Sequence, residues 1–414
     1  MSITDPYAVI RIPDFRYFIT ARIFVTMAVQ MQGVIVGWQI YSLTKDPFAL
    51  GIIGLAEALP ALTVALYAGH LADSQNRKAI ITTAYTVLFL CFCTLAFLSS
   101  DLSLHSESTR ITGIYSVVFV TGLARGFLNP AMFGLLTQCV PSSLYPQSSA
   151  WNSSLLQISI VAGAALSGII YSLVGFTVSY LIDAGMMLVG IFSIASIAPK
   201  ARPVLVKGQK LSESLLSGIK FVFSHQVFLG ALAMDLFAVL FGGAVALLPI
   251  FAEEILHTGP QGLGMLRAAP SIGASLMAVY QIYHPPMRNS GRTLLLCVSG
   301  FGVCMILFAL SSNFYLSLLV LAVSGAFDNV SVVIRSIIMQ TLTPEGMKGR
   351  VSSVNSMFIG SSNEIGEFES GVAAKIFGVI PSVIIGGCMT LLVVGITAVK
   401  APLLRTLDLG KKEA

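Results

Sequence analysis

The sequence predicts an all-α membrane protein with twelve transmembrane helices in two pseudo-symmetric six-helix bundles. Three observations lead to this fold class. The 414-residue chain is 55% hydrophobic and only 10% charged, whereas soluble globular chains carry about a quarter charged residues. Apolar stretches of roughly 20 residues, long enough to cross a bilayer, fill nearly the whole chain between short polar breaks. The two halves also share an ordered set of residues at constant spacing.

Twelve apolar stretches account for most of the chain. They are predicted as spans at 16–42, 48–71, 79–99, 112–139, 148–172, 176–198, 226–251, 261–283, 293–311, 315–341, 351–377 and 379–399. The first stretch is too long for the core of a signal peptide and has no small-residue cleavage site after it, so it is interpreted as the first transmembrane helix. No stretch is left over for a soluble domain.

Lys and Arg are distributed unequally between the two sides of the predicted membrane. Twelve spans place both termini on one side, and most loop cations fall on that side, whereas Lys45, Arg110 and Lys375 fall opposite. Because cytoplasmic loops are enriched in Lys and Arg, we expect a multi-pass protein of the bacterial inner membrane with both termini in the cytoplasm. The net charge of +5 follows from this bias, and its scatter over separate loops argues against nucleic acid as a partner.

The longest polar break, roughly 199–225, lies after the sixth span. It divides the chain into an N-terminal six-helix bundle over 1–198, a cytoplasmic linker over 199–225 and a C-terminal six-helix bundle over 226–414. Apolar residues recur at helical spacing inside the linker, at Leu211, Leu215, Ile219 and Val222. This spacing favours a helix on the cytoplasmic membrane surface, and a solvated linker is the alternative.

Internal repeats support the division into two halves. At one constant offset, Pro141, Asn152, Gly163 and Gly168 match Pro344, Asn355, Gly366 and Gly371. The residues after the first and seventh spans match in the same way, with Pro47, Leu50 and Gly51 against Pro260, Leu263 and Gly264. The halves are therefore interpreted as duplicated.

The segment after the second span carries a recognisable motif. It reads Gly69-His-Leu-Ala-Asp73-Ser-Gln-Asn-Arg77-Lys78 and resembles the signature loop of the major facilitator superfamily, G-x-L-A-D-x-x-x-R-K. In that family the loop acts as a conformational latch, so the resemblance implies a cytoplasmic latch made of Gly69, Asp73, Arg77 and Lys78. It also implies the major facilitator fold.

Two further segments narrow the resemblance. Phe15-Arg16 followed by Arg22, and residues 340–351 with Pro344, Gly349 and Arg350, are similar to the branch that contains the enterobactin exporter and the macrolide efflux proteins. That branch implies efflux of an organic solute, usually as an antiporter driven by protons.

Ionisable residues inside the predicted spans are the candidate functional groups. Each costs about 2.5–3.5 kcal/mol on insertion scales, and such groups usually face a cavity or a partner. The candidates for proton coupling and for the cavity are Glu364, Glu367, Arg125, Asp328, Arg22, Glu57 and Asp235. Asp183 and Arg267 fall toward the outer ends of their spans, where snorkelling to water explains them.

The repeat places two of these charges at equivalent positions. Gly122-x-x-Arg125 in the fourth span aligns with Gly325-x-x-Asp328 in the tenth. The tenth and fourth helices border the central cavity in the family that the chain resembles, so Arg125 and Asp328 are expected at similar depth. They either form a structural ion pair or bracket a polar substrate.

Glu364 and Glu367 form the second candidate site. They share one helical stripe with Gly360 and Gly371, whereas the equivalent positions of the fifth span carry no acid. Two neighbouring carboxylates in a low dielectric raise the pKa of at least one of them, as a proton carrier near neutral pH requires. The alternative is an acid pair that faces water or pairs with a lysine.

The chain shows no nucleophile motif, phosphate loop or zinc-ligand spacing, so we expect no enzyme activity, no cofactor and no metal. The six cysteines are expected to pack inside the protein.

The leading hypothesis is a proton-coupled exporter of an amphipathic organic solute, such as a drug-like compound or a siderophore, that works by alternating access. The alternatives are a lipid or lysophospholipid flippase and a non-transporting membrane sensor or assembly factor. The expected partners are a small organic substrate, protons and membrane lipids, and the expected state is a monomer.

Overall fold

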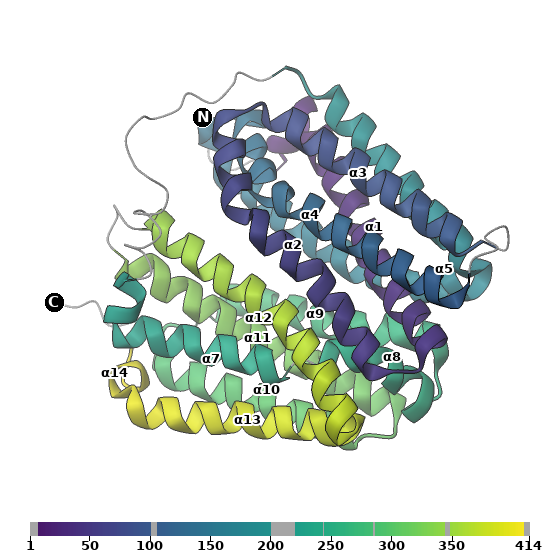
Figure 1. The fold of residues 1–414 in the computed structure, drawn as a ribbon. Helices are drawn as coiled ribbons and strands as arrows, with labels where there is room; N and C mark the ends of the chain where they lie inside the picture. Colours follow the sequence, from purple (N-terminus) through teal and green to yellow (C-terminus); the bar gives the residue numbers. More distant parts are fainter. Residues whose placement is uncertain are drawn as a thin grey trace. The chain divides into compact units, whose positions relative to one another are not determined.

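The computed structural model describes residues 7–100, 106–199, 220–242, 244–284, 286–343 and 348–409, and all regular elements in these ranges are helical (Figure 1). The predicted surface helix of the linker falls mostly on 200–219, outside the described residues. The chain forms two compact units. Unit 1 contains Met1–Lys45, Ala56–Val206 and Gly259–Ala268, and unit 2 contains Asp46–Leu55, Lys207–Thr258 and Ala269–Ala414.

Unit 1 is built from long apolar helices. They are α1 (Pro13–Thr44), most of α2 (Pro47–Ser74), α3 (Arg77–Leu98), α4 (Glu107–Cys139) and α5 (Tyr145–Ser196), with short 3-10 turns at Val9–Arg11 and Ser142–Leu144. Within the unit α1 packs along α5, and α3 packs against α4 and α5. The backbone of α5 leaves the helical conformation at Gly175, with φ 74°. Glycine tolerates this positive φ, and the break falls where the sequence predicts the gap between the fifth and sixth spans.

Unit 2 holds the remaining helices. They are α7 (Gln226–Gly242), a 3-10 turn (Ala244–Leu247), α8 (Leu248–Ile250), a π-helical turn (Phe251–Ile255), α9 (Gly259–Tyr283), α10 (Ser290–Leu310), α11 (Phe314–Leu342), α12 (Lys348–Phe377), α13 (Val379–Lys400) and α14 (Pro402–Arg405). Here α10 packs against α11 and α13, and α7 packs against α12 and α13. The first residues of α9, Gly259–Ala268, are grouped with unit 1.

Ten segments of the described chain are long and apolar enough to cross a membrane. One of them, Gln147–Ser196, covers two predicted spans, on either side of Gly175. The predicted span 351–377 is a helix, α12, but is not among the ten. Charged residues such as Glu364, Glu367 and Lys375 lower its apolar character. A multi-pass membrane protein is thus supported, while twelve spans remain a prediction.

The glycines of the internal repeat make equivalent contacts in the two units. A Cβ atom on Gly122 of α4 would lie 2.2 Å from the carbonyl oxygen of Glu57 in α2, and one on Gly325 of α11 would lie 1.9 Å from that of Pro270 in α9. Both distances are far inside van der Waals contact, so only glycine permits these helices to approach so closely.

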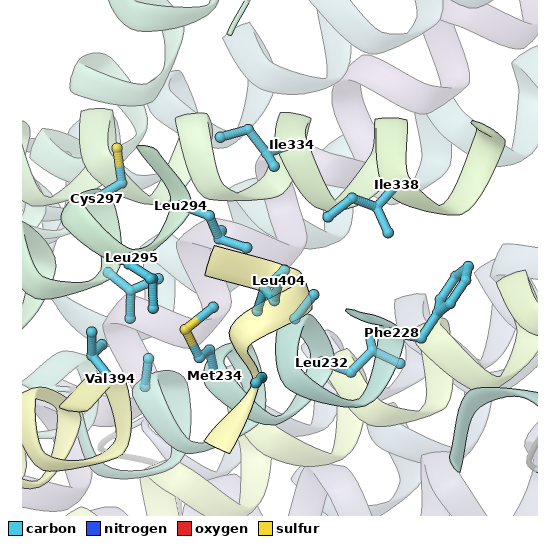
Figure 2. Close-up of a cluster of buried hydrophobic side chains, with 14 of the residues drawn as sticks. Phe228, Leu232, Met234, Leu294, Leu295, Cys297, Ile334, Ile338, Val394 and Leu404 are labelled. Carbon is cyan, nitrogen blue, oxygen red and sulfur yellow. The ribbon is translucent and has the colours of Figure 1, made fainter. Parts of the chain in front are cut away.

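A cluster of buried apolar side chains forms the core of unit 2 (Figure 2). Phe228 and Met234 from α7, Leu294 and Ile334 from the neighbouring α10 and α11, and Leu404 from α14 all contribute to it. Burial of each such side chain contributes about 1.5–3 kcal/mol in water, and α14 lies outside the predicted spans. The short C-terminal helix is therefore held by packing against α7 and α10.

Candidate functional site

Unit 1 contains an intramembrane ion pair between two of the predicted residues. Arg125 of α4 pairs with Glu57 of α2 through the guanidinium Nη1 and the carboxylate Oε1. Their side chains are 36% and 18% exposed, so both charges are partly removed from water. Gly122 lies one turn before Arg125 and brings the two helices together at this level. Arg125 therefore has an acidic partner within its own unit, which the sequence pattern does not reveal.

Unit 2 contains a second buried ion pair, between Asp235 of α7 and Arg335 of α11. The two side chains are only 8% and 6% exposed. The cost of burying each charge is offset by the other and by the hydrogen bond from Arg335 Nε to the carbonyl oxygen of Ser331, at 3.3 Å. Removing one partner leaves the other charge buried alone, and this is the costly change.

A cavity of about 320 Å³ lies inside unit 2. It is bordered by α7, the residues after it, α9, α10, α11 and α12. Most of its wall is apolar, with Phe301, Met305, Leu321 and Phe327 among the larger side chains. The polar lining residues are Asp235, Ser324, Asp328, Ser331, Asn363 and Glu367. We call this space the unit 2 cavity. Three of the predicted candidates line it, namely Asp235, Asp328 and Glu367.

The wall of the unit 2 cavity includes an interrupted helix. Regular α-helix ends at Gly242, continues as a 3-10 turn over Ala244–Leu247, and passes through Pro249 into the π-helical turn Phe251–Ile255. Ala244, Val245 and Leu248 of this segment line the cavity. Broken helices and π-helical turns recur at the binding sites of membrane transporters and at other functional sites, so the irregular backbone is informative here.

The apolar cluster of Figure 2 adjoins the cavity. Ala238, Cys297 and Val298 belong to both the cluster and the cavity lining, and Figure 2 shows Cys297 beside Leu294 and Leu295. One wall of the cavity is therefore part of the packed core of the unit. A wall of this kind holds its shape because core side chains are close-packed.

The basic half of the predicted latch is attached to helix ends. Arg77 donates hydrogen bonds to the carbonyl oxygens of Ala72 and Gly134, each 3.0 Å long, and Lys78 Nζ donates one of 2.8 Å to that of Ala195. Ala72 and Ala195 lie in the last turns of α2 and α5, where cations satisfy free carbonyl groups and favour the helix dipole. Both basic residues thus bind helices together within unit 1.

Three predicted positions, Gly69, Asp73 and Glu364, are described only as helical backbone. Gly69 and Asp73 lie in the final turns of α2, and Glu364 lies in α12. The side chains of Asp73 and Glu364 lie outside the described part of the structure. The roles of Asp73 in the latch and of Glu364 in proton coupling therefore remain predictions. Arg22 is half-buried in α1, and within the described chain its Nε has no hydrogen-bond partner.

The expectation for Asp183 is wrong. Its side chain does not snorkel to water but is completely buried in α5, at 0% exposure. Among the described residues neither carboxylate oxygen has a hydrogen-bond partner. A buried network lies near it, in which Tyr180 donates a 2.8 Å hydrogen bond to Gln39 and Gln39 donates one of 2.8 Å to Ser99. The position of a residue along a span predicts its depth in the membrane. It does not predict whether the helix turns the side chain toward the protein interior, and that direction explains the burial of Asp183.

Sequence reasoning also missed the neutral polar residues of the cavity. Asn363, Ser324 and Ser331 line it, but a search for ionisable groups passes over them. One signal was available, because Asn363 and Glu367 are separated by four residues and therefore lie on the same helix face. Arg335 stands out in the sequence only as an intramembrane charge, with no indication that Asp235 is its partner.

In the part of the chain that the structure describes, no group of three or more His, Cys, Asp or Glu side chains is arranged to hold a metal ion. The six cysteines are free thiols, of which Cys91, Cys139, Cys297 and Cys304 are buried as predicted, Cys93 is intermediate and Cys388 is exposed. The lining of the unit 2 cavity combines apolar side chains with hydroxyl, amide, thiol and carboxylate groups.

Comparison with known proteins gives a consistent result. The family described as transmembrane secretion effector matches residues 4–412. The enterobactin exporter EntS of Shigella flexneri is 24% identical over 345 residues, which cover 83% of this chain and 80% of the exporter. EntS of Escherichia coli O81 (strain ED1a) is 23% identical over 349 residues, with the same coverage.

Solved structures of low identity share the fold. A POT family transporter in complex with 5-aminolevulinic acid superposes with a TM-score of 0.74 at 12% identity, covering 94% of this chain and 96% of the other. A bacterial homologue of the iron transporter ferroportin, in an inward-facing state, gives a TM-score of 0.70 at 13% identity, covering 95% and 99%.

Proposed function

Because the chain belongs to the transmembrane secretion effector family of the major facilitator superfamily, we propose that it is a secondary active transporter that exports an amphipathic organic solute by alternating access. The match over residues 4–412 is the observation that carries this proposal. Similarity to enterobactin exporters over 83% of the chain supports outward transport of an organic compound. The substrate of those relatives is not transferred, since the identity is only 24%.

Protons are the proposed driving ion. Export against a gradient needs an energy source, and the family match together with the absence of a phosphate-loop motif in the sequence favours an ion gradient. Carboxylates at membrane depth are the groups that can bind and release a proton there. Asp328 and Glu367 line the unit 2 cavity, Glu57 and Asp235 are held in ion pairs, and Glu364 keeps its place as the first proton carrier that we propose.

The proposed setting is the inner membrane, with both termini in the cytoplasm and the Gly69–Lys78 segment as a cytoplasmic latch. Arg77 and Lys78 bind the ends of helices in unit 1, so this segment is anchored to the unit that we expect to move as one body. The monomer is the proposed functional state.

Flux through proteoliposomes tests the proposal. The purified chain is reconstituted and exposed to a panel of amphipathic cations, neutral compounds and siderophore-like anions, with and without an imposed pH gradient. We expect uphill transport of at least one class only when the gradient is present. Protein-free liposomes are the control for passive permeation. Flux that never exceeds this control for any compound contradicts a transport function. Flux that is equal with and without the pH gradient contradicts proton coupling.

A further inference from the structure

The charged side chains that line the unit 2 cavity are all acidic in the part of the chain that the structure describes. Asp235 is paired with Arg335, and Arg335 is not among the residues that line the cavity. Asp328 also lines it, and its side chain is exposed there although it lies in the middle of α11. Glu367 adds a third carboxylate. The described lining of the cavity therefore carries carboxylates and no basic side chain.

The internal repeat shows why Asp328 is placed differently from its counterpart. In unit 1 the residue three positions after the contact glycine is Arg125, and Glu57 of the neighbouring helix pairs with it. In unit 2 the equivalent residue is Asp328, and the backbone contact of Gly325 falls on Pro270 instead of an ionisable residue. Proline can supply no charge. The position that holds an ion pair in unit 1 thus holds a carboxylate beside an open space in unit 2.

The walls of the cavity define what kind of cation would fit. A divalent metal ion such as Ca²⁺ takes about 6–8 oxygen ligands, and a wall built largely from Phe301, Met305, Leu321 and Phe327 does not supply them. An organic cation with an apolar body fits this lining better, because its body can contact the apolar wall while a lining carboxylate attracts its positive charge. The volume of about 320 Å³ is at the lower end of ligand pockets, roughly 300–1,000 Å³, which favours a compact ligand.

We propose that the unit 2 cavity binds a compact organic monocation, with its ammonium group at Asp328 and its apolar body against Phe301 and Phe327. Ser324, Ser331 and Asn363 provide further hydrogen-bonding groups for the polar end. One ligand class is thereby assigned to one defined cavity. Binding of the cation requires no membrane gradient and does not depend on the proposed transport function. Only the export of the bound cation rests on that function.

Binding to the purified full-length chain in detergent tests the proposal. Benzyltrimethylammonium is the probe, and neopentylbenzene, its uncharged carbon analogue of the same shape, is the matched control ligand. Calorimetry should show binding of the cation and at least about tenfold weaker binding of the analogue. Asp328→Asn should weaken cation binding by about tenfold or more, as expected for loss of the electrostatic attraction between the carboxylate and the quaternary ammonium, and Asp328→Glu should retain most of it. Glu107→Gln removes an equal charge from the exposed N-terminus of α4 and should have no effect.

Cys297 reports on the location of binding. It lines the cavity, so in a variant that keeps Cys297 as its sole cysteine the probe should slow alkylation by N-ethylmaleimide several-fold, and neopentylbenzene should not. This measurement decides the question if Asp328→Asn fails to fold. Equal affinity for the cation and its analogue, unchanged affinity in a folded Asp328→Asn protein, or no protection of Cys297 would each overturn the proposal. Failure of flux with binding intact would instead count against the transport function.

Discussion

Lys375 Nζ, near the end of α12, donates a hydrogen bond of 2.8 Å to Asp46 Oδ2, directly before α2, and both residues belong to unit 2. The other carboxylate oxygen, Asp46 Oδ1, accepts a 3.0 Å hydrogen bond from the N–H of Phe48 in the first turn of α2. Burial alone would raise the pKa of Asp46, but the bonds from Lys375 and Phe48 and the lysine charge hold the pKa below its usual range. Asp46 therefore stays ionised at neutral pH.

Neutralising Asp46 should cause a small loss of stability that depends on pH. Asp46→Asn keeps an acceptor for Phe48 but removes the charge, and exposed pairs contribute about 0.2–1 kcal/mol. Because the pKa is lowered in the folded protein, this contribution is complete above the ordinary aspartate pKa of about 3.9 and disappears as the pH falls through the lowered value. Thermal unfolding in detergent at several pH values measures it. Lys375→Gln should lose as much thermal stability as the Asp46→Asn/Lys375→Gln double variant. Additive losses of stability would contradict the pairing.

Arg125 should be coupled to Glu57 more strongly than to Asp328. Glu57→Gln or Arg125→Gln leaves a partly buried charge without its ion pair, at a cost of about 1–3 kcal/mol, whereas the double variant removes both charges. A double-mutant cycle on thermal stability should therefore give a large coupling energy for this pair. The same cycle for Arg125 and Asp328 tests the pair suggested by the repeat, and a larger coupling there would reverse this ranking.

Glu364→Gln should abolish uphill transport driven by a pH gradient while exchange of substrate across the membrane continues. Glutamine has the size of glutamate but cannot bind and release a proton. Proteoliposome flux and counterflow measure the two activities side by side, with Glu369→Gln on the same helix as the matched control. Full gradient-driven transport by Glu364→Gln would shift the assignment to Glu57, Asp235 or Asp328.

Asp183→Asn should leave the unfolding temperature of the protein unchanged or raise it. Asp183 is completely buried, and in the described chain its carboxylate has no hydrogen-bond partner. Removing a buried ionisable group without a partner relieves a desolvation cost rather than breaking a contact. Asp183→Lys, which is larger and cationic, should reduce the yield of folded protein sharply. A fall of several degrees in Asp183→Asn would show that the carboxylate has a stabilising partner.

Gly325→Ala should severely reduce folded protein, because its Cβ would lie 1.9 Å from the carbonyl oxygen of Pro270 and α9 and α11 would have to separate. Gly395→Ala in α13 is the matched control. Apart from the adjacent residues and the backbone of its own helix, no described atom lies within 4 Å of the position that its Cβ would take. Alanine also favours helix over glycine by about 1 kcal/mol. Size-exclusion chromatography and unfolding temperatures measure the folded fraction and the stability of the two variants. Equal stability would show that the helices yield easily at this contact.

Much of the local structure could be predicted from the sequence, because the length of an apolar stretch and the backbone preferences of glycine and proline are local properties of the chain. The long helices, the break at Gly175 and the kinship with the major facilitator superfamily follow from such patterns. The repeat also identified Gly122 and Gly325 as equivalent, and their contacts with α2 and α9 agree with that equivalence.

The partners of the charges were decided only by the tertiary structure. Composition places Arg125, Asp235 and Asp328 at membrane depth, but ion pairing depends on how each helix is rotated and which helix faces it. Packing joined Arg125 to Glu57 and Asp235 to Arg335, left Asp328 on the wall of a cavity and buried Asp183 completely. These outcomes depend on contacts between residues far apart in the chain, and a helical pattern constrains the depth of a residue much more tightly than the direction in which its side chain points.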